Sequence, residues 1–147
     1  MEIRSPETDP EFELYYDLRW RVQREPWGQP RGSERDELDD AATHVAGYDE
    51  AKGLVCVGRL HAVETGVGQV RYMAVEEPLR GQGLGQAVLD ELERLAKRQG
   101  MSVIILDARE AAVGGYRRNG YEALGEGHVL FGEVRHSKMR KRLDGSA

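Results

Sequence analysis

The stretch Val75-Glu76-Glu77-Pro78-Leu79-Arg80-Gly81-Gln82-Gly83-Leu84-Gly85-Gln86-Ala87 decides the fold, because an apolar run ends there and a helical pattern begins. Backbone N–H groups at the start of a helix have no partner within the helix, and residues without a Cβ atom let a phosphate approach them. The Arg80 guanidinium adds the cation that a diphosphate requires. The stretch therefore predicts a strand, a phosphate-binding loop and the start of a helix. A tight strand-to-helix turn without a ligand is the alternative.

Three apolar runs lie before this loop, and only short turns separate them. They are Thr43–Tyr48, Leu54–Glu64 and Val70–Val75. Such short connections allow only antiparallel hairpins, because a parallel crossover needs about a dozen residues. After the loop, apolar residues at helical spacing predict a helix that begins at Leu84 and ends at Gly100. The β-branched run Val103–Leu106 is then expected to return parallel to the third run, as a strand buried on both faces.

The remaining segments complete a mixed α/β sheet that is flanked by helices. We expect a helix at Asp9–Glu25, an exposed loop at Trp27–Asp40 with a helical turn at Glu34–Leu38, a helix at Ala108–Arg118, and closing strands at Tyr121–Leu124 and His128–His136, the last with a longer alternative that ends at Leu143. The predicted sheet is largely antiparallel, with one parallel strand pair. The length of 147 residues favours one domain that spans residues 1–147.

The composition excludes several classes of protein. With 39% hydrophobic and 32% charged residues, and no apolar run near the roughly 20 residues of a membrane span, the chain is not expected to enter a membrane. Its net charge of −5 argues against nucleic acid as a partner. The N-terminal residues carry no apolar stretch of the secretory type, and the single cysteine, Cys56, has no disulfide partner. We therefore expect a cytoplasmic protein.

Two other phosphate-binding loops fit the glycine stretch less well. A Walker-type loop requires Gly-Lys-Ser/Thr, which does not follow here. A dinucleotide-binding loop is closer, because Asp107 ends a strand at about the right distance to hold a ribose. That loop requires a glycine where Gln86 stands, and it follows a parallel strand array rather than an antiparallel meander. A nucleotide-binding regulatory domain remains an alternative.

The pattern Arg80-x-x-Gly83-x-Gly85 after an antiparallel strand resembles the acyl-CoA loop of the GNAT superfamily of N-acetyltransferases, and the resemblance extends from about Leu54 to Tyr121. It implies a parallel strand pair that splays apart, with acetyl-CoA as cosubstrate in the gap and without a metal ion. It also implies that the pantetheine pairs with the backbone of the upstream strand and that the diphosphate lies on the loop. The implied cofactor-binding residues are Met73, Ala74, Val75, Arg80, Gly81, Gln82, Gly83, Leu84, Gly85 and Gln86.

A second motif, Ala112-Val113-Gly114-Gly115-Tyr116-Arg117-Arg118-Asn119-Gly120-Tyr121, resembles a later motif of the same family. Two residues depart from the family pattern: Gly115 stands where a bulky apolar residue is usual, and Arg109 stands where an asparagine often hydrogen-bonds the cofactor. By resemblance, Tyr116 is the catalytic donor near the thiolate that thioester aminolysis expels, and the Val75 N–H is the oxyanion donor. A core tyrosine is the alternative.

The proton balance of this reaction leaves several assignments open. Transfer from a phenol of pKa near 10 to a thiolate is uphill by about 2 kcal/mol, unless a neighbouring arginine lowers the phenol pKa. An alkylamine of pKa about 10.4 needs a base before it can attack. Four residues qualify by type: Glu64, His61, His136 and Glu110.

The acceptor is the least determined partner. The implied acceptor is an amine on a small molecule, peptide or protein, and a homodimer stays open. The acidic residues Glu34, Asp36, Glu37, Asp39 and Asp40 either attract a cationic acceptor or form a solvated surface. A non-catalytic acyl-CoA sensor is the alternative function.

Overall fold

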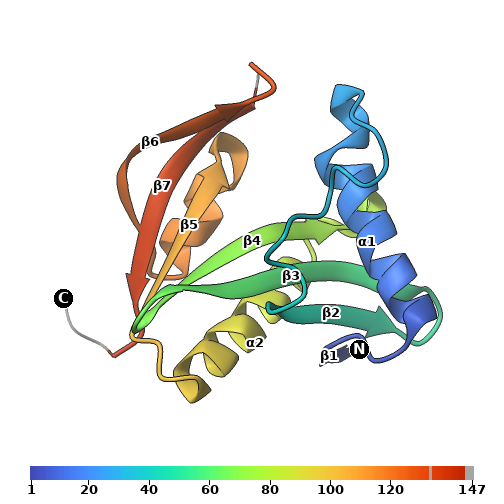
Figure 1. The fold of residues 1–147 in the computed structure, drawn as a ribbon, viewed down its shortest axis with the longest axis horizontal. Helices are drawn as coiled ribbons and strands as arrows, with labels where there is room; N and C mark the ends of the chain where they lie inside the picture. The colour runs from blue at the N-terminus through green and yellow to red at the C-terminus, as the bar shows by residue number, and fades with distance from the viewer. Residues whose placement is uncertain (133, 145–147) are drawn as a thin grey trace.

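The computed structural model describes residues 1–132 and 134–144, and within them seven strands form one sheet in the order β1-β2-β3-β4-β5-β7-β6. The strands are β1 (Glu2–Arg4), β2 (Thr43–Asp49), β3 (Gly53–Glu64), β4 (Val67–Val75), β5 (Val103–Arg109), β6 (Glu122–Leu130) and β7 (Val134–Arg142). Neighbouring strands are antiparallel except β4 and β5, which are parallel (Figure 1). The predicted mixed sheet with one parallel pair is confirmed.

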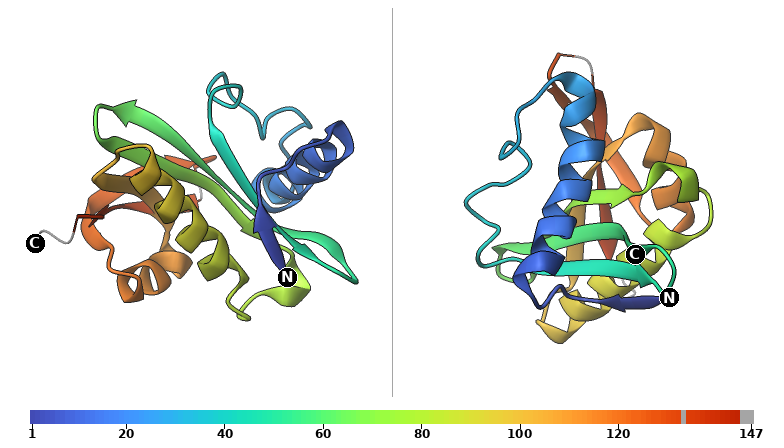
Figure 2. Two further views of the ribbon diagram at one scale, coloured as in Figure 1. Left: turned by 90° about the horizontal axis from the view of Figure 1, so that it is seen from below. Right: turned by 90° about the vertical axis from the view of Figure 1, so that its right-hand side faces the viewer.

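Helices cover both faces of the sheet. They are α1 (Asp9–Gln23), α2 (Leu84–Arg98) and α3 (Val113–Arg118), with 3-10 turns η1 (Glu25–Trp27), η2 (Glu77–Leu79) and η3 (Glu110–Ala112). Helix α1 packs on one face, where Tyr15 and Leu18 are buried against β2, β3 and β4. Helix α2 packs on the other face through Val88 and Leu92, and α3 lies on that side too (Figure 2, left). None of these described helices is long and apolar enough to cross a membrane.

Helix α1 begins with reciprocal hydrogen bonds at its N-terminus. The Thr8 hydroxyl accepts a bond from the Glu11 N–H, and the Glu11 carboxylate accepts one from the Thr8 N–H, each at 3.2 Å. This capping box satisfies N–H groups that the helix itself leaves unpaired. It orients α1, whose C-terminal end reaches the functional site.

The gap in the sheet comes from a bulge in β4. Pairing with β5 ends at Val70 and Leu106, while pairing with β3 shifts so that Tyr72 and Met73 both lie opposite Gly58. Tyr72 has a φ of 59°, in the left-handed region that a bulge can impose on one residue. A Cβ atom at Gly58 would collide with side chains that include Met73. The bulge therefore turns β4 away from β5, and the two strands diverge as a fork (Figure 1).

The predictions for β5 and its flanks need two corrections. The predicted helix Ala108–Arg118 ends as expected but starts too early, because Ala108 and Arg109 continue β5 by pairing with Ser137 and His136 of β7. A 3-10 turn, η3, follows, and α3 begins at Val113. Strand β5 is buried on one face, with the alternate residues half-buried, rather than buried on both faces. The longer strand carries Arg109 to the end of the fork.

Two predicted breaks are also wrong. The predicted turn after Leu124 lies inside β6, because Gly125 and Gly127 fall at register shifts in the pairing with β7. The real turn lies between Leu130 and Val134, so His128 belongs to β6 and not to β7. The predicted helical turn at Glu34–Leu38 is replaced by two separate turns, at 31–34 and 37–41.

Candidate active site

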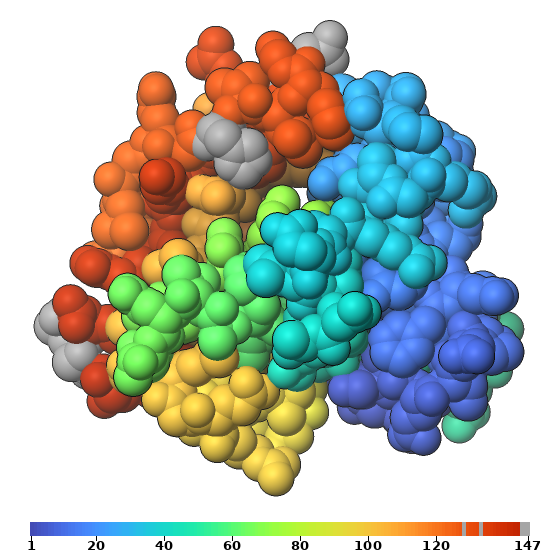
Figure 3. Space-filling model, viewed as in Figure 1, coloured from blue at the N-terminus to red at the C-terminus, as the bar shows by residue number. Residues whose placement is uncertain are grey.

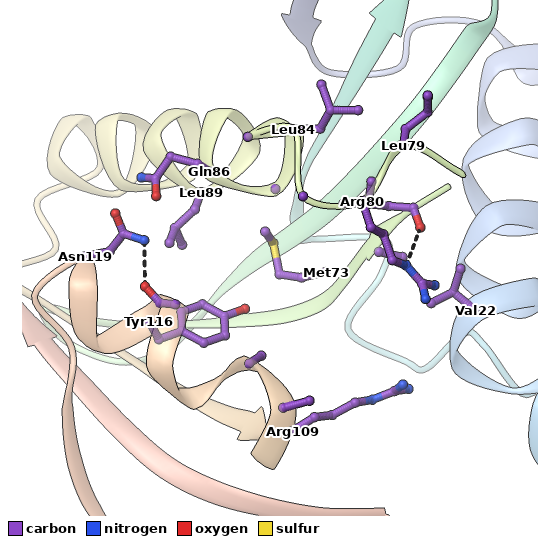
Figure 4. A pocket seen from close by; sticks show the side chains of 18 of the residues that line it. Val22, Met73, Leu79, Arg80, Leu84, Gln86, Leu89, Arg109, Tyr116 and Asn119 are labelled. Atoms are coloured by element: carbon purple, nitrogen blue, oxygen red, sulfur yellow. Dashed lines mark hydrogen bonds between the residues drawn. The ribbon is translucent and has the colours of Figure 1, made fainter. Parts of the chain in front are cut away.

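A cavity of about 630 Å³ lies along β4, at the start of α2 (Figure 4). Nine of the ten predicted cofactor-binding residues line it, and Gln82 lies outside as an exposed residue. The other lining residues come from α1, β5, η3 and α3, and from the loop and first turns of α2: Val22, Gln23, Leu79, Leu89, Arg109, Ala111, Ala112, Gly115, Tyr116, Arg118 and Asn119. The predicted loop, the edge of β4 and Tyr116 thus meet in one space.

The glycine loop has the geometry of an anion cradle. Gly81 and Gly83 have φ values of 81° and 83°, which favour glycine, and a Cβ atom on either would meet nothing within 4 Å. The first bond of α2 runs from the Ala87 N–H to the Gly83 carbonyl at 3.1 Å, so the three preceding N–H groups have no acceptor within the helix. The Arg80 side chain is held beside them by a 3.3 Å bond to the Val75 carbonyl. These donors fit a diphosphate.

The edge of β4 that faces the gap carries a main-chain donor. The Glu76 N–H bonds the Val55 carbonyl of β3 at 2.9 Å. Since successive N–H groups of a strand point to opposite edges, the Val75 N–H points away from β3, toward the gap. Its direction agrees with the predicted oxyanion donor.

Tyr116 projects from α3 toward β4, and its ring packs edge-on against Tyr121 with centroids 5.6 Å apart (Figure 4). Its hydroxyl makes no hydrogen bond to any residue that the structure describes. Burial raises the pKa of Tyr116 to about 12, so the exception considered above, an arginine that lowers this pKa, does not apply. Proton transfer to a thiolate of ordinary basicity is then uphill by about 5 kcal/mol. The phenol suits hydrogen-bond donation rather than complete proton transfer.

A second cavity, of about 190 Å³, fills the fork itself. It shares five lining residues with the first cavity: Gln23, Met73, Arg109, Ala112 and Tyr116. Its other walls come from both arms of the fork and from β6 and β7: Arg24, Val70, Arg71, Tyr72, Leu106, Asp107, Ala108, Leu130 and His136. The two cavities meet at Tyr116.

Of the four residues considered as a base, His136 alone lines one of these two cavities within the described part of the chain. Its Nδ1 lies 3.1 Å from the Val134 carbonyl, which requires a proton on Nδ1 and leaves Nε2 as the basic nitrogen of the neutral ring. His61 instead lies against Arg59, and burial together with the charges of Arg59 and Arg71 lowers its pKa. Glu64 and Glu110 are exposed outside both linings.

Neither interpretation of the acidic loop is correct, because Glu34, Asp36 and Asp39 turn inward. The Arg19 guanidinium bonds Asp39 at 2.9 Å, and Arg59 bonds Asp36 at 2.6 Å and Asp39 at 3.1 Å. Burial raises the pKa of Asp39, but the charge of Arg19 and hydrogen bonds to the carboxylate outweigh this and hold it below its usual range. The connection between α1 and β2 is thereby fixed across the sheet beside α1 (Figure 3, cyan).

Sequence reasoning missed the two arginines of this network. Arg59 stands inside the apolar run of β3, and Arg19 lies between Leu18 and Trp20 in α1, and both side chains are fully buried. A cation inside an apolar run indicates a buried carboxylate partner, because an unpaired buried charge is very costly. The acids of the loop were the available partners.

Comparisons with known proteins agree with this geometry. The model of the acetyltransferase (GNAT) family matches residues 12–121. The N-acetyltransferase YjcF of Bacillus subtilis (strain 168), itself uncharacterized, is 33% identical over 112 residues, which are 76% of this chain and 79% of the relative.

Solved structures share the fold at lower identity. An aminoglycoside 6'-N-acetyltransferase complexed with coenzyme A has a TM-score of 0.83 at 16% identity and covers 100% of this chain and 99% of its own. An acyl-CoA N-acyltransferase from Pseudomonas aeruginosa has a TM-score of 0.79 at 22% identity, with 95% and 97% covered.

The splayed parallel pair and the glycine loop at the start of α2 define the fold of an acyl-CoA N-acyltransferase. The chain belongs to the GNAT family of acetyltransferases.

Proposed function

We propose that the protein transfers the acetyl group of acetyl-CoA to a primary amine by direct attack on the thioester. The observation that supports this most strongly is the meeting of two cavities at Tyr116. One has the donors for a diphosphate and, for a pantetheine, an edge of β4 that no neighbouring strand pairs with beyond Val70, and the other has room for an acceptor. A purely cofactor-binding module needs only the first.

The residues divide the chemistry between them. The N–H groups at the start of α2 and the Arg80 guanidinium hold the diphosphate, while the edge of β4 from Met73 to Val75 aligns the pantetheine. The Val75 N–H stabilises the negative charge that forms on the carbonyl oxygen. Tyr116 donates a hydrogen bond to the departing sulfur.

His136 is the base in this proposal. The acceptor arrives as an ammonium ion, loses one proton to His136 Nε2, and attacks the thioester carbonyl carbon with the freed electron pair. A C–N bond forms, the C–S bond breaks, and the sulfur leaves as a thiolate. The second amine proton passes to the departing thiolate as the amide forms, which gives the neutral thiol, and His136 then returns its proton to water, so that charge balances.

Thiol release from acetyl-CoA with a panel of primary amines tests the proposal. We expect amine-dependent release, and His136→Gln should lower kcat/KM for the amine by about 100-fold or more at neutral pH. That loss should shrink as the pH approaches the amine pKa, because the neutral amine then forms without help. Glu64→Gln, which changes an exposed carboxylate outside the cavities, is the matched control.

Calorimetry with coenzyme A separates the transferase from a sensor. We expect His136→Gln to bind coenzyme A as the unchanged protein does. Tight binding of coenzyme A without thiol release from any amine would contradict the proposed transfer and favour a sensor.

A further inference from the structure

The cavity in the fork is electropositive. Three arginines line it, Arg24 at the end of α1, Arg71 on β4 and Arg109 at the end of β5. Asp107 is the one carboxylate in the described lining, and it has an interaction partner of its own. The lining thus carries an excess of positive charge, in a chain whose net charge is −5.

Two of these arginines have no carboxylate within ion-pair distance in the described part of the chain. The Arg24 guanidinium is 8% exposed and donates to the carbonyls of Ser33 and Gln23, each at 3.0 Å. The Arg109 guanidinium donates to the Gln23 side-chain oxygen at 2.6 Å and lies over the Trp27 ring, 4.8 Å from its centroid. Neutral acceptors position both groups, and neither forms an ion pair with a described carboxylate, although the charge of Glu34 offsets part of that of Arg24.

Arg71 has only a weak ion-pair partner. Its closest carboxylate oxygen, on Asp36, is 3.5 Å away, and the same carboxylate bonds Arg59 at 2.6 Å. The Arg71 side chain is 37% exposed, so it has freedom to turn toward a ligand. The Asp36 carboxylate therefore pairs mainly with Arg59 and only weakly with Arg71.

Burying these positive charges with little negative charge beside them costs free energy, and a bound anion would lower that cost. Burial and the charges of Arg71 and Arg19 lower the pKa of Arg24, and together they outweigh the opposite effect of Tyr72 and Glu34. Burial and the charge of Arg24 do the same to Arg109. Cations that repel one another in a cavity are typical of a site completed by a bound anion.

Coenzyme A does not account for the whole cluster. Its diphosphate cradle lies on the other cavity, at the start of α2, and neither Arg24 nor Arg71 lines that cavity. The fork cavity of about 190 Å³ is also smaller than the pockets of drug-sized ligands, which start at about 300 Å³. The cavity therefore has room only for a small molecule.

We propose that the acceptor is a small amine that also carries an anionic oxyacid group, a carboxylate or a phosphoryl group, which Arg24, Arg71 and Arg109 bind. This rests on the proposed acetyl transfer, since it identifies the acceptor of that reaction. It reverses the expectation of a cationic acceptor drawn to the acidic loop. Guanidinium groups suit this task because their paired N–H donors match the two oxygens of such an anion.

Matched pairs of amines test the charge requirement. We compare β-alanine with β-alaninamide, and phosphoethanolamine with ethanolamine, by thiol release from acetyl-CoA at one pH, with rates corrected for the neutral-amine fraction. The anionic member of at least one pair should have a kcat/KM at least tenfold higher. The better pair distinguishes carboxylate from phosphoryl recognition.

Variants locate the recognition. Arg71→Gln and Arg24→Gln should each lower kcat/KM for the anionic amine by about 10- to 100-fold, mainly through KM, and bring the ratio within the pair toward one. Affinity for coenzyme A should not change. Arg94→Gln, which removes an exposed arginine on α2 that pairs with Glu91, is the control. If Arg24→Gln fails to fold, Arg71→Gln alone provides the test, because the Arg71 side chain is partly exposed and its loss should not disturb folding.

The outcomes separate this inference from the proposed function. Equal use of anionic and neutral amines, with a ratio that Arg71→Gln leaves unchanged, overturns the inference while acetyl transfer stands. If no amine releases thiol, the transfer fails, and calorimetry of β-alanine and phosphoethanolamine against the protein saturated with coenzyme A decides the inference. Binding that Arg71→Gln weakens supports it, and no binding of either compound overturns it.

Discussion

The two sides of the fork are built from different parts of the chain. On the proposed cofactor side, the donors are mostly main-chain N–H groups, at the start of α2 beside Gly81 and Gly83 and on β4, and Arg80 adds one side-chain cation. On the acceptor side, the polar groups are side chains from α1, β4, β5 and β7. A substitution leaves a main-chain N–H donor in place, whereas it removes a side-chain donor such as an arginine. If the proposed function holds, the fold itself determines the cofactor, and side chains dispersed along the chain determine the acceptor.

The largest effect on stability is expected in the buried network around Asp39, which fixes the connection between α1 and β2. Asp39→Asn removes the carboxylate that Arg19 and Arg59 share, and leaves two fully buried arginines short of negative charge. Breaking a buried ion pair from one side costs about 3 to 5 kcal/mol. Urea unfolding should show a loss of this size, and Asp40→Asn, at an exposed position of the same connection, should change the free energy of unfolding by less than about 0.5 kcal/mol.

An equal stability of the two variants would contradict the anchoring role of the network. The connection between α1 and β2 would then lie over the sheet without contributing to the folded state. The acceptor side would depend on strand geometry alone, as the cofactor side does.

The same difference explains what could be predicted from the sequence. The loop from Arg80 to Gly85 is contiguous, so its residue types and spacing indicated its geometry, and the structure brings them to one cavity. Arg24 and Arg71 lie far apart in sequence, and each looks like an ordinary surface residue until the fold is known. Their proximity depends on the β4 bulge, which no local pattern around Tyr72 indicated.

The closing strands show a second limit. Gly125 and Gly127 are common turn residues, so they predicted a break, but they relieve the register shifts of a continuous strand. Likewise, Ala108 is compatible with helix or strand, and pairing with β7 decides for the strand. In both cases tertiary pairing overrides local preference.

Tyr116→Phe tests the boundary between the two sides. The phenol has a pKa of about 12 and makes no bond to a described residue, so its loss should disturb the fold little. Loss of a donor to the leaving sulfur should lower kcat by up to about 100-fold without changing affinity for coenzyme A. Single-turnover thiol release measures the chemical step. Tyr16→Phe, on α1 outside both cavities, is the control.

An unchanged single-turnover rate would assign Tyr116 to packing against Tyr121. A decrease in coenzyme A affinity instead of kcat would place the hydroxyl on the cofactor side alone. The pH profile adds a check: with its pKa near 12, Tyr116 should cause no decline in rate up to about pH 10.

Gly85→Ala isolates the cofactor side. Gly85 lies in the first turn of α2 without a positive φ, and an added Cβ atom would lie at an ordinary 3.6 Å from Val75 Cγ2. Alanine in a helix should leave stability equal or raise it by up to about 1 kcal/mol. The same methyl group enters the cradle and should weaken coenzyme A binding by about tenfold, with KM for the amine unchanged.

Calorimetry and thermal unfolding together check these opposite signs. Gly114→Ala is the matched control, because Gly114 is helical in α3 and lines neither cavity. If Gly85→Ala binds coenzyme A with full affinity, the diphosphate does not approach the start of α2.

The smallest effect is a dependence of stability on pH that belongs to the buried network of Arg19, Arg59 and the acidic loop beside α1. Burial lowers the pKa of His44 and of His61 below the ordinary value of about 6.5, so the unfolded chain binds more protons than the folded one as the pH falls below that value. The stability of the folded state should therefore be constant above about pH 7 and decrease below about 6.5. Hydrogen bonds and arginine charges hold the pKa values of Asp36 and Asp39 low against burial, which adds a second decrease below about pH 4. Urea unfolding from pH 8 to pH 4 should show the first decrease, and His61→Gln should make it shallower. A free energy of unfolding that stays constant down to pH 5 would mean that these histidines take up protons in the folded state as readily as in the unfolded chain, and that the network beside α1 does not exclude water from them.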